Sequence, residues 1–499
     1  METNISTVGQ IYKNKYQPNK TAIIFGNERV SYAELDDRVR AFANFLRAKG
    51  IAKNDKVMLN AGNCPEFIYA YFGVVRNSAV IVPVNPSFTP PELTYIAKDS
   101  DAKIIIIQEG ILLKLGHTEE SLSEMLGLTV FTLNQKLMEE IKASPRDDFD
   151  FVTDNQEIST FLYTSGTTGH PKAVMLTHFN LVANAWQNAL ALEAVNEDIF
   201  MCVLPMFHVF ACTAAVLMPL FSGGTVVILE TFIPKTVIGS LLENNITVFM
   251  GVPAMYMLFI EAGKNNIFFP KLRLAISGGA ALPVDVYYKA KEIANLPIIE
   301  GYGLTEASPS SAFNPPSGIQ KPGSIGLALP EVDAIIGGEN DEELPTGEVG
   351  ELLLRGPNIM KGYYNKPEDT AETLKNGWLH TGDLAKMDED RYIYIVDRKK
   401  DMIIVAGLNV YPREIEEVMY QHPKIRDAAV IGEDDKLRGE TVVAYIVFKE
   451  NETASETEIL KWLKERLATY KIPRRLVFVN ELPRTSSGKI MKRMLRQKS

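Results

Sequence analysis

The sequence predicts an α/β protein with a large, multi-layered N-terminal domain built on α/β sheets and a small C-terminal α+β domain. Three observations point to this fold class. A chain of 499 residues is longer than one hydrophobic core usually supports. Short apolar runs rich in β-branched residues alternate with helical patterns. Near residue 400 this alternation gives way to a smaller mixed pattern, which indicates a second domain.

The first predicted elements are a hairpin and a capped helix. Residues 20–26 (KTAIIFG) and 29–35 (RVSYAEL) are expected to pair as the hairpin. Ser31 can cap the following helix, which is expected to run through residues 35–50. Gly50 is the predicted stop, because glycine readily adopts the left-handed conformation that ends many helices.

Parallel strands and connecting helices come next along the chain. Four short runs are apolar almost throughout, which is typical of strands buried on both faces of a parallel sheet. These runs are KVMLNA (56–61), VIVPVN (80–85), KIIIIQ (103–108) and TVVILE (225–230). Helices are predicted between them, for example PEFIYAYFGVVR (65–76) and PKTVIGSLLENN (234–245). Repeated strand–helix units of this kind build a layered α/β domain.

The C-terminal hundred or so residues follow a different pattern. Residues 392–407 are expected to form a strand, a charged break and a second strand. Ser455 and Glu458 have the spacing of a capping box. The other predicted elements are a helix at 413–421, strands at 427–433 and 441–449, and a helix at 459–468. We therefore expect one domain at 1–397 and another at 398–499, with a hinge near 398–401 in the segment RKKD.

Composition excludes several classes of protein. The formal net charge of -10 argues against a protein that binds the phosphate backbone of nucleic acids. Three cysteines without a CxxC pair and six scattered histidines form no disulfide framework or zinc pattern, so a reducing cytoplasm is expected. The longest apolar run, VFACTAAVLMPLF (209–221), is shorter than the ~20 residues of a transmembrane helix. The N-terminus has no apolar signal core.

The segment YTSGTTGHPKAVMLTH (163–178) is rich in hydroxyls and glycines and follows the strand-like ISTFL. Glycines let main-chain N–H groups approach a ligand, and successive N–H groups with hydroxyls form a nest for anionic oxygens. A lysine adds positive charge. The segment is not a Walker A loop, because Gly166 and Gly169 are too close, Pro171 intervenes and Ala173 follows Lys172. It predicts a phosphate-binding loop, with an ordinary polar surface loop as the alternative.

The stretch YTSGTTGHPK resembles the signature of the adenylate-forming superfamily, which includes acyl-CoA synthetases, amino-acid adenylation domains and beetle luciferases. Seven further segments match in the same order, so the resemblance covers nearly the whole chain. They are LPMFHVF (204–210), GGAALP (278–283), EGYGLTE (300–306), GELLLRGP (350–357), WLHTGD (378–383), DRKKDMIIVAGLNVYPREIE (397–416) and PRTSSGKI (483–490).

This resemblance implies ATP-dependent activation of a carboxylic acid. A carboxylate is a poor electrophile, and attachment of AMP turns its oxygen into a good leaving group that a thiol can then displace. The first step brings two anions together, the carboxylate and the triphosphate. The protein must therefore supply positioning and electrostatic stabilisation from cations and aimed donors.

The resemblance also implies a nucleotide site. Tyr302 would stack on adenine, Asp383 would accept from the ribose hydroxyls, and Arg398 would be its ribose or phosphate partner. Thr164 and Glu306 would hold Mg²⁺, for which hydroxyl and carboxylate oxygens are apt ligands. Taken singly, GYGLTE is typical of a strand-to-helix turn, TGD of a turn, and a lone arginine of a surface charge. The implied nucleotide-binding set is Thr164, Ser165, Gly166, Thr167, Thr168, Gly169, Lys172, Gly279, Ala280, Gly301, Tyr302, Gly303, Asp383, Ile395 and Arg398.

Four catalytic residues are implied in the same way: Lys489, His208, Thr305 and Glu306. Thr305 would face the α-phosphate and the carboxylate. His208 would donate to the substrate carboxylate, although a histidine among apolar residues is by default part of a core. Lys489 would reach the α-phosphate and carboxylate during adenylation, and the plainer alternative is a basic C-terminal tail.

A mobile small domain follows from the position of Lys489. This lysine is far in sequence from the phosphate loop, so its domain must close on the large one. In the superfamily the small domain then rotates to present another face for thioester formation. The resemblance implies a pivot at Lys400 and passage of the pantetheine arm of coenzyme A beside Gly407. A charged break between strands is otherwise usually a hairpin loop.

The substrates follow from what the sequence offers around these motifs. HVFACTAAV (208–216) has no carboxylate to hold a substrate ammonium, which disfavours an amino acid. No carrier segment follows Lys489, which favours free coenzyme A as the acceptor. The Met-rich TVFMGVPAMYMLFIEAG (247–263) suits an alkyl chain, or equally a helix core. A medium- or long-chain fatty acid is therefore expected, with aryl acids as the alternative.

Competing functions are an acyl-adenylate ligase that loads a separate carrier protein and a non-catalytic nucleotide-binding module. Gly407 and the RKKD segment disfavour the first, while Glu306 and Lys489 disfavour the second. A luciferase-type oxidation is not required by any residue. The expected ligands are ATP, Mg²⁺, coenzyme A and a small carboxylic acid, with neither nucleic acid nor a transmembrane segment, and with a homodimer as a candidate assembly.

Overall fold

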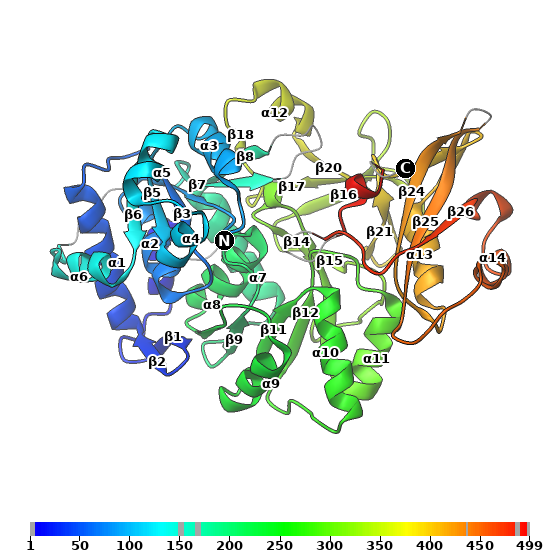
Figure 1. Cartoon of the computed structure of the whole chain (residues 1–499), viewed down its shortest axis with the longest axis horizontal. Helices are drawn as coiled ribbons and strands as arrows, with labels where there is room; N and C mark the ends of the chain where they lie inside the picture. Colours follow the sequence, from blue (N-terminus) through cyan, green and yellow to red (C-terminus); the bar gives the residue numbers. More distant parts are fainter. Residues whose placement is uncertain (1–4, 148–153, 165–170, 436–437, 485–489, 497–499) are drawn as a thin grey trace.

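A computed structural model describes residues 5–147, 154–164, 171–435, 438–484 and 490–496 (Figure 1). The described chain contains four sheets. The largest has nine strands, parallel from β13 to β1 and antiparallel at both edges. In spatial order they are β15 (Leu327–Ala328), β14 (Ser310–Phe313), β13 (Ile298–Gly303), β12 (Leu274–Ser277), β11 (Val248–Gly251), β9 (Ile199–Cys202), β10 (Thr225–Ile228), β1 (Thr21–Phe25) and β2 (Glu28–Ser31).

A second sheet has seven strands and carries the polar loop segment at one side. In order they are β18 (Gly362–Tyr363), β8 (Lys172–Thr177), β7 (Ile158–Thr164), β4 (Val80–Pro83), β3 (Lys56–Asn60), β5 (Ala102–Gln108) and β6 (Thr129–Leu133). Strands β7 to β6 are parallel, while β8 and β18 are antiparallel. The four predicted parallel strands are confirmed. Three of them lie in this sheet, and β10 lies in the nine-stranded sheet.

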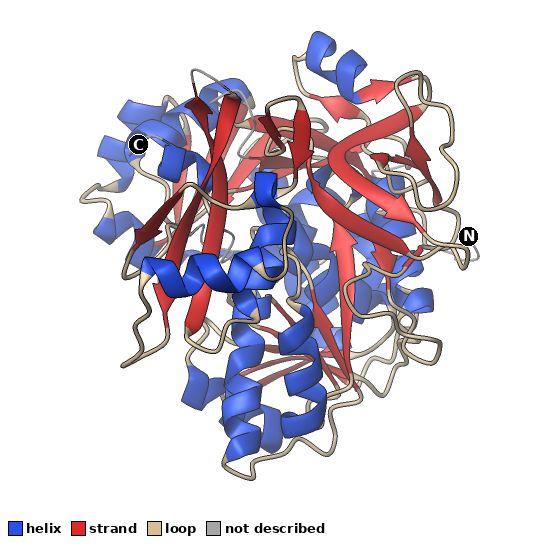
Figure 2. Cartoon of the chain, turned by 90° about the vertical axis from the view of Figure 1, so that its right-hand side faces the viewer, coloured by secondary structure: helices blue, strands red, loops and turns tan. Residues whose placement is uncertain are grey.

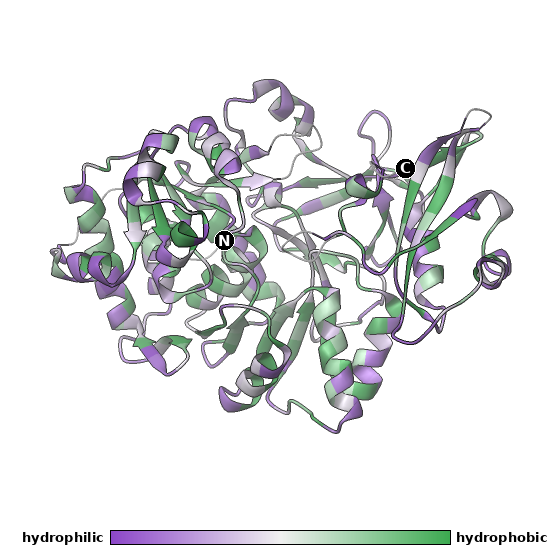
Figure 3. Ribbon diagram, in the orientation of Figure 1, coloured by the Kyte–Doolittle hydropathy of each residue, from purple (hydrophilic) through white to green (hydrophobic). Residues whose placement is uncertain are grey.

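Helices fill the space between the two sheets and cover their outer faces. The main core joins both sheets through α1 (Tyr32–Ala48), α2 (Pro65–Arg76), α7 (His178–Ala191) and the π-helix η2 (Phe210–Leu217). A second core lies under α9 (Pro234–Glu243), α10 (Pro253–Lys264) and α11 (Val284–Ala294). A third lies under α3 (Pro90–Asp99), α4 (Glu109–Lys114) and α5 (Glu119–Leu126). Figure 3 shows the strands as hydrophobic and much of the outer helix surface as hydrophilic. The predicted multi-layered α/β fold is confirmed.

The predicted N-terminal hairpin and helix cap are confirmed. β1 and β2 pair antiparallel. Ser31 and Glu34 form a reciprocal capping box, with the Glu34 N–H donating to the Ser31 hydroxyl at 3.2 Å. Gly50 follows the helix end with φ +83°. The remaining elements of this part are η1 (Val8–Lys13), α6 (Gln135–Ala143), α8 (Met218–Phe221), η3 (Thr305–Ala307) and α12 (Pro367–Thr373).

A third, antiparallel sheet of five strands connects the large domain to the small one. It contains β16 (Asp333–Gly337), β17 (Gly350–Arg355), β20 (Trp378–Met387), β19 (Leu374–Lys375) and β21 (Ile393–Arg398). β21 pairs with β20 and leads directly into the C-terminal residues. The sequence analysis anticipated β21 as a strand but not the sheet to which it belongs.

The small α+β domain lies at the opposite end of the molecule from α1 and α6 (Figure 1), and Figure 2 turns it toward the viewer. Its sheet is β23 (Leu408–Val410), β22 (Ile403–Val405), β25 (Gly439–Phe448) and β24 (Ile425–Asp435), with β26 (Arg475–Phe478) beside β25. Helices α13 (Pro412–Tyr420) and α14 (Glu456–Lys464) pack on its core, and η4 (Thr469–Lys471) and α15 (Lys492–Arg496) complete it.

The predicted capping box at α14 is only half correct. The Ser455 hydroxyl does accept from the Glu458 N–H, at 3.1 Å. The Glu458 carboxylate does not return to the helix start, because it pairs with the Lys424 ammonium at 2.9 Å. A long-range ion pair has thus replaced a local hydrogen bond.

Within the described ranges, no helix combines the length and the apolar character needed to cross a bilayer.

A buried ion-pair network ties the N-terminal elements together. Asp36 on α1 accepts from the Tyr12 hydroxyl at 2.9 Å and from the Arg76 guanidinium at 3.0 Å. Lys13 and Arg40 lie 3.1 and 3.3 Å from the same carboxylate. Burial alone would raise the pKa of Asp36, but Lys13, Tyr12 and Arg76 together lower it. One carboxylate therefore fixes η1, α1 and α2.

We predict that Asp36→Asn destabilises the protein by about 3 kcal/mol, because the buried Arg76 guanidinium loses its counter-charge. Urea unfolding measures the change. The neighbouring Asp37→Asn is the matched control, since the Asp37 side chain is 46% exposed in its pair with Arg146. That control should cost less than about 1 kcal/mol. Equal losses in the two variants would contradict the structural role of Asp36.

Candidate active site

Three residues from distant parts of the chain meet at the end of β13. The Tyr302 hydroxyl donates to the Asp383 carboxylate on β20. The Arg398 guanidinium on β21 lies 3.2 Å from the other oxygen of the same carboxylate, and the two residues face each other in the β20–β21 register. Asp383 is buried, whereas Arg398 is 40% exposed. The structure therefore brings together Tyr302, Asp383 and Arg398, as the sequence analysis expected.

The glycines that flank Tyr302 allow close packing of β13 against β14. A Cβ at Gly301 would lie 2.3 Å from the Phe313 ring, and one at Gly303 would lie 2.2 Å from the Pro309 carbonyl oxygen. Neither position tolerates a side chain without movement of its neighbour. These two glycines thus hold the strand that presents Tyr302.

Glu306 lies just beyond β13, in η3 with Thr305. Its Oε1 accepts from the Tyr363 hydroxyl at 2.8 Å, and its carbonyl oxygen accepts from the Met360 N–H at 2.8 Å. Tyr363 is a functional candidate that the sequence analysis missed. The one available signal was its position in GYYN, between the matched segments GELLLRGP and WLHTGD.

The polar loop begins and ends beside this group. Thr164 ends β7 and Lys172 begins β8, where the two residues face each other in register. Ser165, Gly166, Thr167, Thr168 and Gly169 lie outside the described residues. The Lys172 ammonium pairs with Asp369 and lies 5.3 Å from the centre of the Tyr363 ring. Asp369 is a second residue that the sequence analysis missed.

The residues at this position suit Mg²⁺. η3 lies next to β8, whose first residue, Lys172, faces Thr164 in register. They offer a carboxylate and a hydroxyl, which are the hard oxygen donors that Mg²⁺ prefers alongside water and substrate phosphates. The Tyr363 hydroxyl donates a hydrogen bond to Oε1 of Glu306, and Oε2 is the other oxygen of the same carboxylate.

His208 lies immediately before the π-helix η2. Its Nδ1 accepts from the Phe210 N–H at 3.3 Å, and its carbonyl oxygen accepts from the Cys212 N–H at 3.0 Å. The side chain is half-buried rather than enclosed in the core. The Phe210 ring lies 3.1 Å from where a Cβ of Gly278 would be, so the start of η2 packs against the GGAALP segment. Within that segment Gly279 and Ala280 are exposed.

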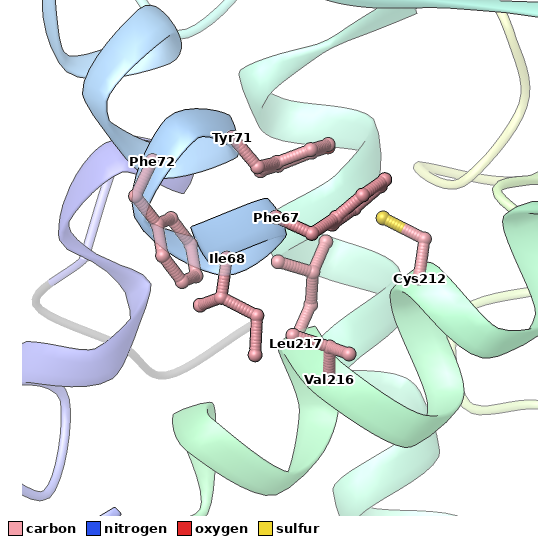
Figure 4. Close-up of a pocket in the computed structure, with 7 residues that line it drawn as sticks. All are labelled: Phe67, Ile68, Tyr71, Phe72, Cys212, Val216 and Leu217. Carbon is pink, nitrogen blue, oxygen red and sulfur yellow. The ribbon is translucent and has the colours of Figure 1, made fainter. Parts of the chain in front are cut away.

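A small void lies on the inner side of η2 (Figure 4). Its volume is about 10 Å³, which is close to that of one water-sized probe, and its lining is apolar. It is bounded by Phe67, Ile68, Tyr71, Phe72, Cys212, Val216 and Leu217. The void is too small for an alkyl chain. The Met-rich segment 247–263 forms β11 and α10, where Tyr256, Phe259 and Ile260 pack in the core, as the helix-core alternative predicts.

The joint between the domains begins at β21. Ile395 offers its carbonyl oxygen to the Arg413 guanidinium at 2.8 Å, and the Lys399 ammonium binds Glu351 at 3.0 Å. Lys400 is exposed in the turn that follows.

Gly407 lies in the two-residue turn between β22 and β23, where Ala406 has φ +50° and Gly407 has φ +83°. A Cβ at Gly407 would meet no atom within 4 Å, so the backbone conformation rather than crowding favours glycine there. Lys489 lies outside the described residues.

The contact between the two domains encloses an unpredicted carboxyl group. Glu300, at the start of EGYGLTE, is buried and accepts from the Leu282 N–H at 3.1 Å. Burial raises the pKa of Glu300 to about 7, against an opposing effect of Arg413 and with a smaller contribution from Glu417. Arg413 and Glu417 both belong to α13 of the small domain. The pKa of Glu417 is also raised by burial.

The raised pKa of Glu300 predicts that the stability of the contact between the two domains depends on pH. Glu300 binds its proton more tightly in the folded protein, so its contribution to stability is present below its ordinary pKa and is lost as pH rises toward 7. The free energy of unfolding of Glu300→Gln, taken relative to that of wild type, should increase by up to about 3 kcal/mol as pH rises from 5 to 8. Urea unfolding at each pH measures the difference. Glu292→Gln, at an exposed position of α11, is the control, and equal pH profiles for both variants would refute the assignment.

Family models match two parts of the chain. One, described as AMP-binding enzyme, covers residues 12–364, and the other, described as AMP-binding enzyme C-terminal domain, covers residues 414–489. The long-chain-fatty-acid–CoA ligase of Bacillus subtilis (strain 168) is 35% identical over 96% of this chain and 91% of its own length. Feruloyl-CoA synthase of Amycolatopsis sp is 34% identical over 98% of both chains.

Solved structures agree with these relatives. ATP-bound MatB from Rhodopseudomonas palustris superposes with a TM-score of 0.93 at 32% identity, covering 99% of this chain and 98% of that one. The apo form of the same protein, with the same coverage and 31% identity, gives 0.81. Because the two forms share one sequence, the difference reflects conformation. This chain therefore has an overall arrangement nearer to that of the ATP-bound form.

Proposed function

The chain belongs to the AMP-binding enzyme family and is an acid–CoA ligase, and on this premise we propose that it activates a medium- or long-chain fatty acid. The fatty acid and ATP give acyl-AMP and pyrophosphate. Coenzyme A then takes the acyl group and AMP is released. One observation supports the placement of this reaction at the site described above. Tyr302, Asp383 and Arg398 converge beside Glu306.

In the first step a carboxylate oxygen of the acid attacks the α-phosphorus of ATP, and the bond to pyrophosphate breaks. We assign Asp383 to the ribose hydroxyls, with Arg398 paired to the same carboxylate. Tyr302 provides a flat face for adenine. Thr305 is assigned to the reacting phosphate and His208 to the acid carboxylate. Mg²⁺, when held by Glu306 and Thr164, neutralises phosphate charge.

In the second step the thiol sulfur of coenzyme A attacks the acyl carbonyl, and the bond to AMP breaks. We propose that the small domain rotates between the steps about Lys400, with the domain boundary at 397/398 and with Gly407 on the face used for coenzyme A. The TM-scores of 0.93 and 0.81 against ATP-bound and apo MatB support an arrangement suited to the first step. A cytoplasmic location and a homodimer stay predictions from the sequence.

A second candidate substrate class is an aryl acid. The identity to feruloyl-CoA synthase, 34%, nearly equals that to the long-chain-fatty-acid–CoA ligase, 35%. We place the fatty acid first because the further relatives at 33–34% identity include several that carry the long-chain name. Transfer to a separate carrier protein is the third alternative.

We predict that pyrophosphate release depends on a medium- or long-chain fatty acid and that coenzyme A increases turnover. The measurement is a pyrophosphate assay over a panel of acids of 4 to 18 carbons (about 2-carbon steps), ferulate and benzoate, with and without coenzyme A. Selective use of the aryl acids would replace the proposed substrate class. Pyrophosphate release unaffected by coenzyme A, with a carrier protein as the sole acceptor, would replace the acceptor.

Lys489→Ala should reduce adenylation by at least about a hundredfold, because the reacting anions lose an aimed cation. It should leave thioester formation from supplied acyl-AMP within about twofold, since the small domain presents another face in that step. Each half-reaction is measured separately in single-turnover assays. Lys492→Ala is unsuitable as the control, because Lys492 pairs with Glu416 at 2.8 Å. The exposed Lys464→Ala serves instead. Equal loss in both half-reactions would contradict domain rotation.

A further inference from the structure

Tyr363 makes a contact that neither the sequence nor the family match assigned. Its hydroxyl donates to Oε1 of Glu306 at 2.8 Å, although the two residues are 57 positions apart. Tyr363 is 8% exposed, so this hydrogen bond is partly shielded from water. Hydrogen bonds from neutral donors to a charged acceptor are shorter and stronger than those between neutral groups. The contact is therefore more than incidental packing.

The backbone around Tyr363 is anchored independently of that contact. The Lys361 N–H donates to the Met175 carbonyl at 3.0 Å, and the Tyr364 N–H donates to the Ala173 carbonyl at 2.9 Å. The Tyr363 N–H donates to the Thr370 hydroxyl at 2.9 Å. β18 is thus fixed to β8, the strand that leaves the polar loop, and the phenol is aimed from a rigid position.

The Tyr363 ring also lies near Lys172, at the start of β8. The Lys172 ammonium lies 5.3 Å from the ring centre and pairs with Asp369 on α12. One ring therefore touches a cation that borders the polar loop and a carboxylate assigned to Mg²⁺. Phenylalanine at this position would keep the cation–π contact and lose the hydrogen bond alone.

We propose that Tyr363 is a positioning residue that orients the Glu306 carboxylate for Mg²⁺–ATP. This inference rests on the proposed function and extends it to a residue with no assigned role. The phenol holds Oε1, so rotation of the carboxylate is restricted, and Oε2 is the oxygen that would bind the cation. Partners that hold metal ligands in this way typically change metal affinity about 10- to 100-fold when they are removed.

The test compares Tyr363→Phe with a matched control, Tyr364→Phe. The Tyr364 hydroxyl also donates to a carboxylate, Asp101 at 2.8 Å, but at an exposed bond away from Glu306. Tyr363→Phe should raise the Mg²⁺ concentration for half-maximal pyrophosphate release about tenfold, while kcat at saturating Mg²⁺ changes less than about threefold. Tyr364→Phe should match wild type. A general structural defect would instead lower kcat and thermal stability together.

A binding measurement separates the proposal from its effect on turnover. ATP affinity is determined calorimetrically with and without Mg²⁺ for wild type, Tyr363→Phe, Glu306→Gln and the double variant. Tyr363→Phe should weaken the Mg²⁺-dependent part about tenfold, leave Mg²⁺-free affinity unchanged, and have no further effect in the Glu306→Gln background.

Two results would overturn the inference while the proposed function stands: equal Mg²⁺ dependence in Tyr363→Phe and Tyr364→Phe, or a Tyr363→Phe effect that persists without the Glu306 carboxylate. A wild-type protein that releases no pyrophosphate with any acid would instead refute the proposed function, and the inference with it.

Discussion

The carboxylate of Asp383 links the nine-stranded sheet to the five-stranded sheet that leads into the small domain. It accepts from Tyr302 at the end of the nine-stranded sheet, and it pairs with Arg398 on the last strand before the small domain. Asp383 itself belongs to the five-stranded sheet. Because the group is buried, its charge is shielded little and each partner is held firmly. The proposed nucleotide site and the strand that leads into the small domain therefore share one anchor.

The positive charge that faces the nucleotide must come from groups close to the site. The chain carries a net charge of -10, so no general positive field attracts a triphosphate. Two of the cations assigned to the nucleotide, Arg398 and Lys172, are already paired with Asp383 and Asp369. Under the proposed function, the additional positive potential would come from Mg²⁺ and from Lys489. Closure of the small domain would then be an electrostatic step as well as a steric one.

The sequence predicted the elements whose signal is local. Apolar β-branched runs identified β3, β4, β5 and β10, and the Ser31 hydroxyl identified the start of α1. Local patterns could not divide these strands between two sheets, since β10 and β3 are equally apolar while their neighbours in space come from distant segments. The five-stranded antiparallel sheet was missed for the same reason.

The site residues were predicted or missed for a similar reason. Motif order placed Tyr302, Asp383 and Arg398 in one site, and the structure brings them into contact. Tyr363 and Asp369 escaped notice because their partners, Glu306 and Lys172, are far away in sequence. Glu300 escaped because its raised pKa arises from burial against α13, which no spacing within EGYGLTE reveals.

The buried carboxyl groups between β13 and α13 have a consequence for the energetics of turnover. Burial raises the pKa of Glu300 to about 7 and also raises the pKa of Glu417, so both groups bind protons more tightly here than in water. A small domain that leaves this surface returns both groups to water, where glutamate ionises at much lower pH. Each rotation of the small domain away from this surface would then release protons to the buffer, and each return would take them up again. The heat of the catalytic cycle would accordingly depend on the ionisation enthalpy of the buffer chosen.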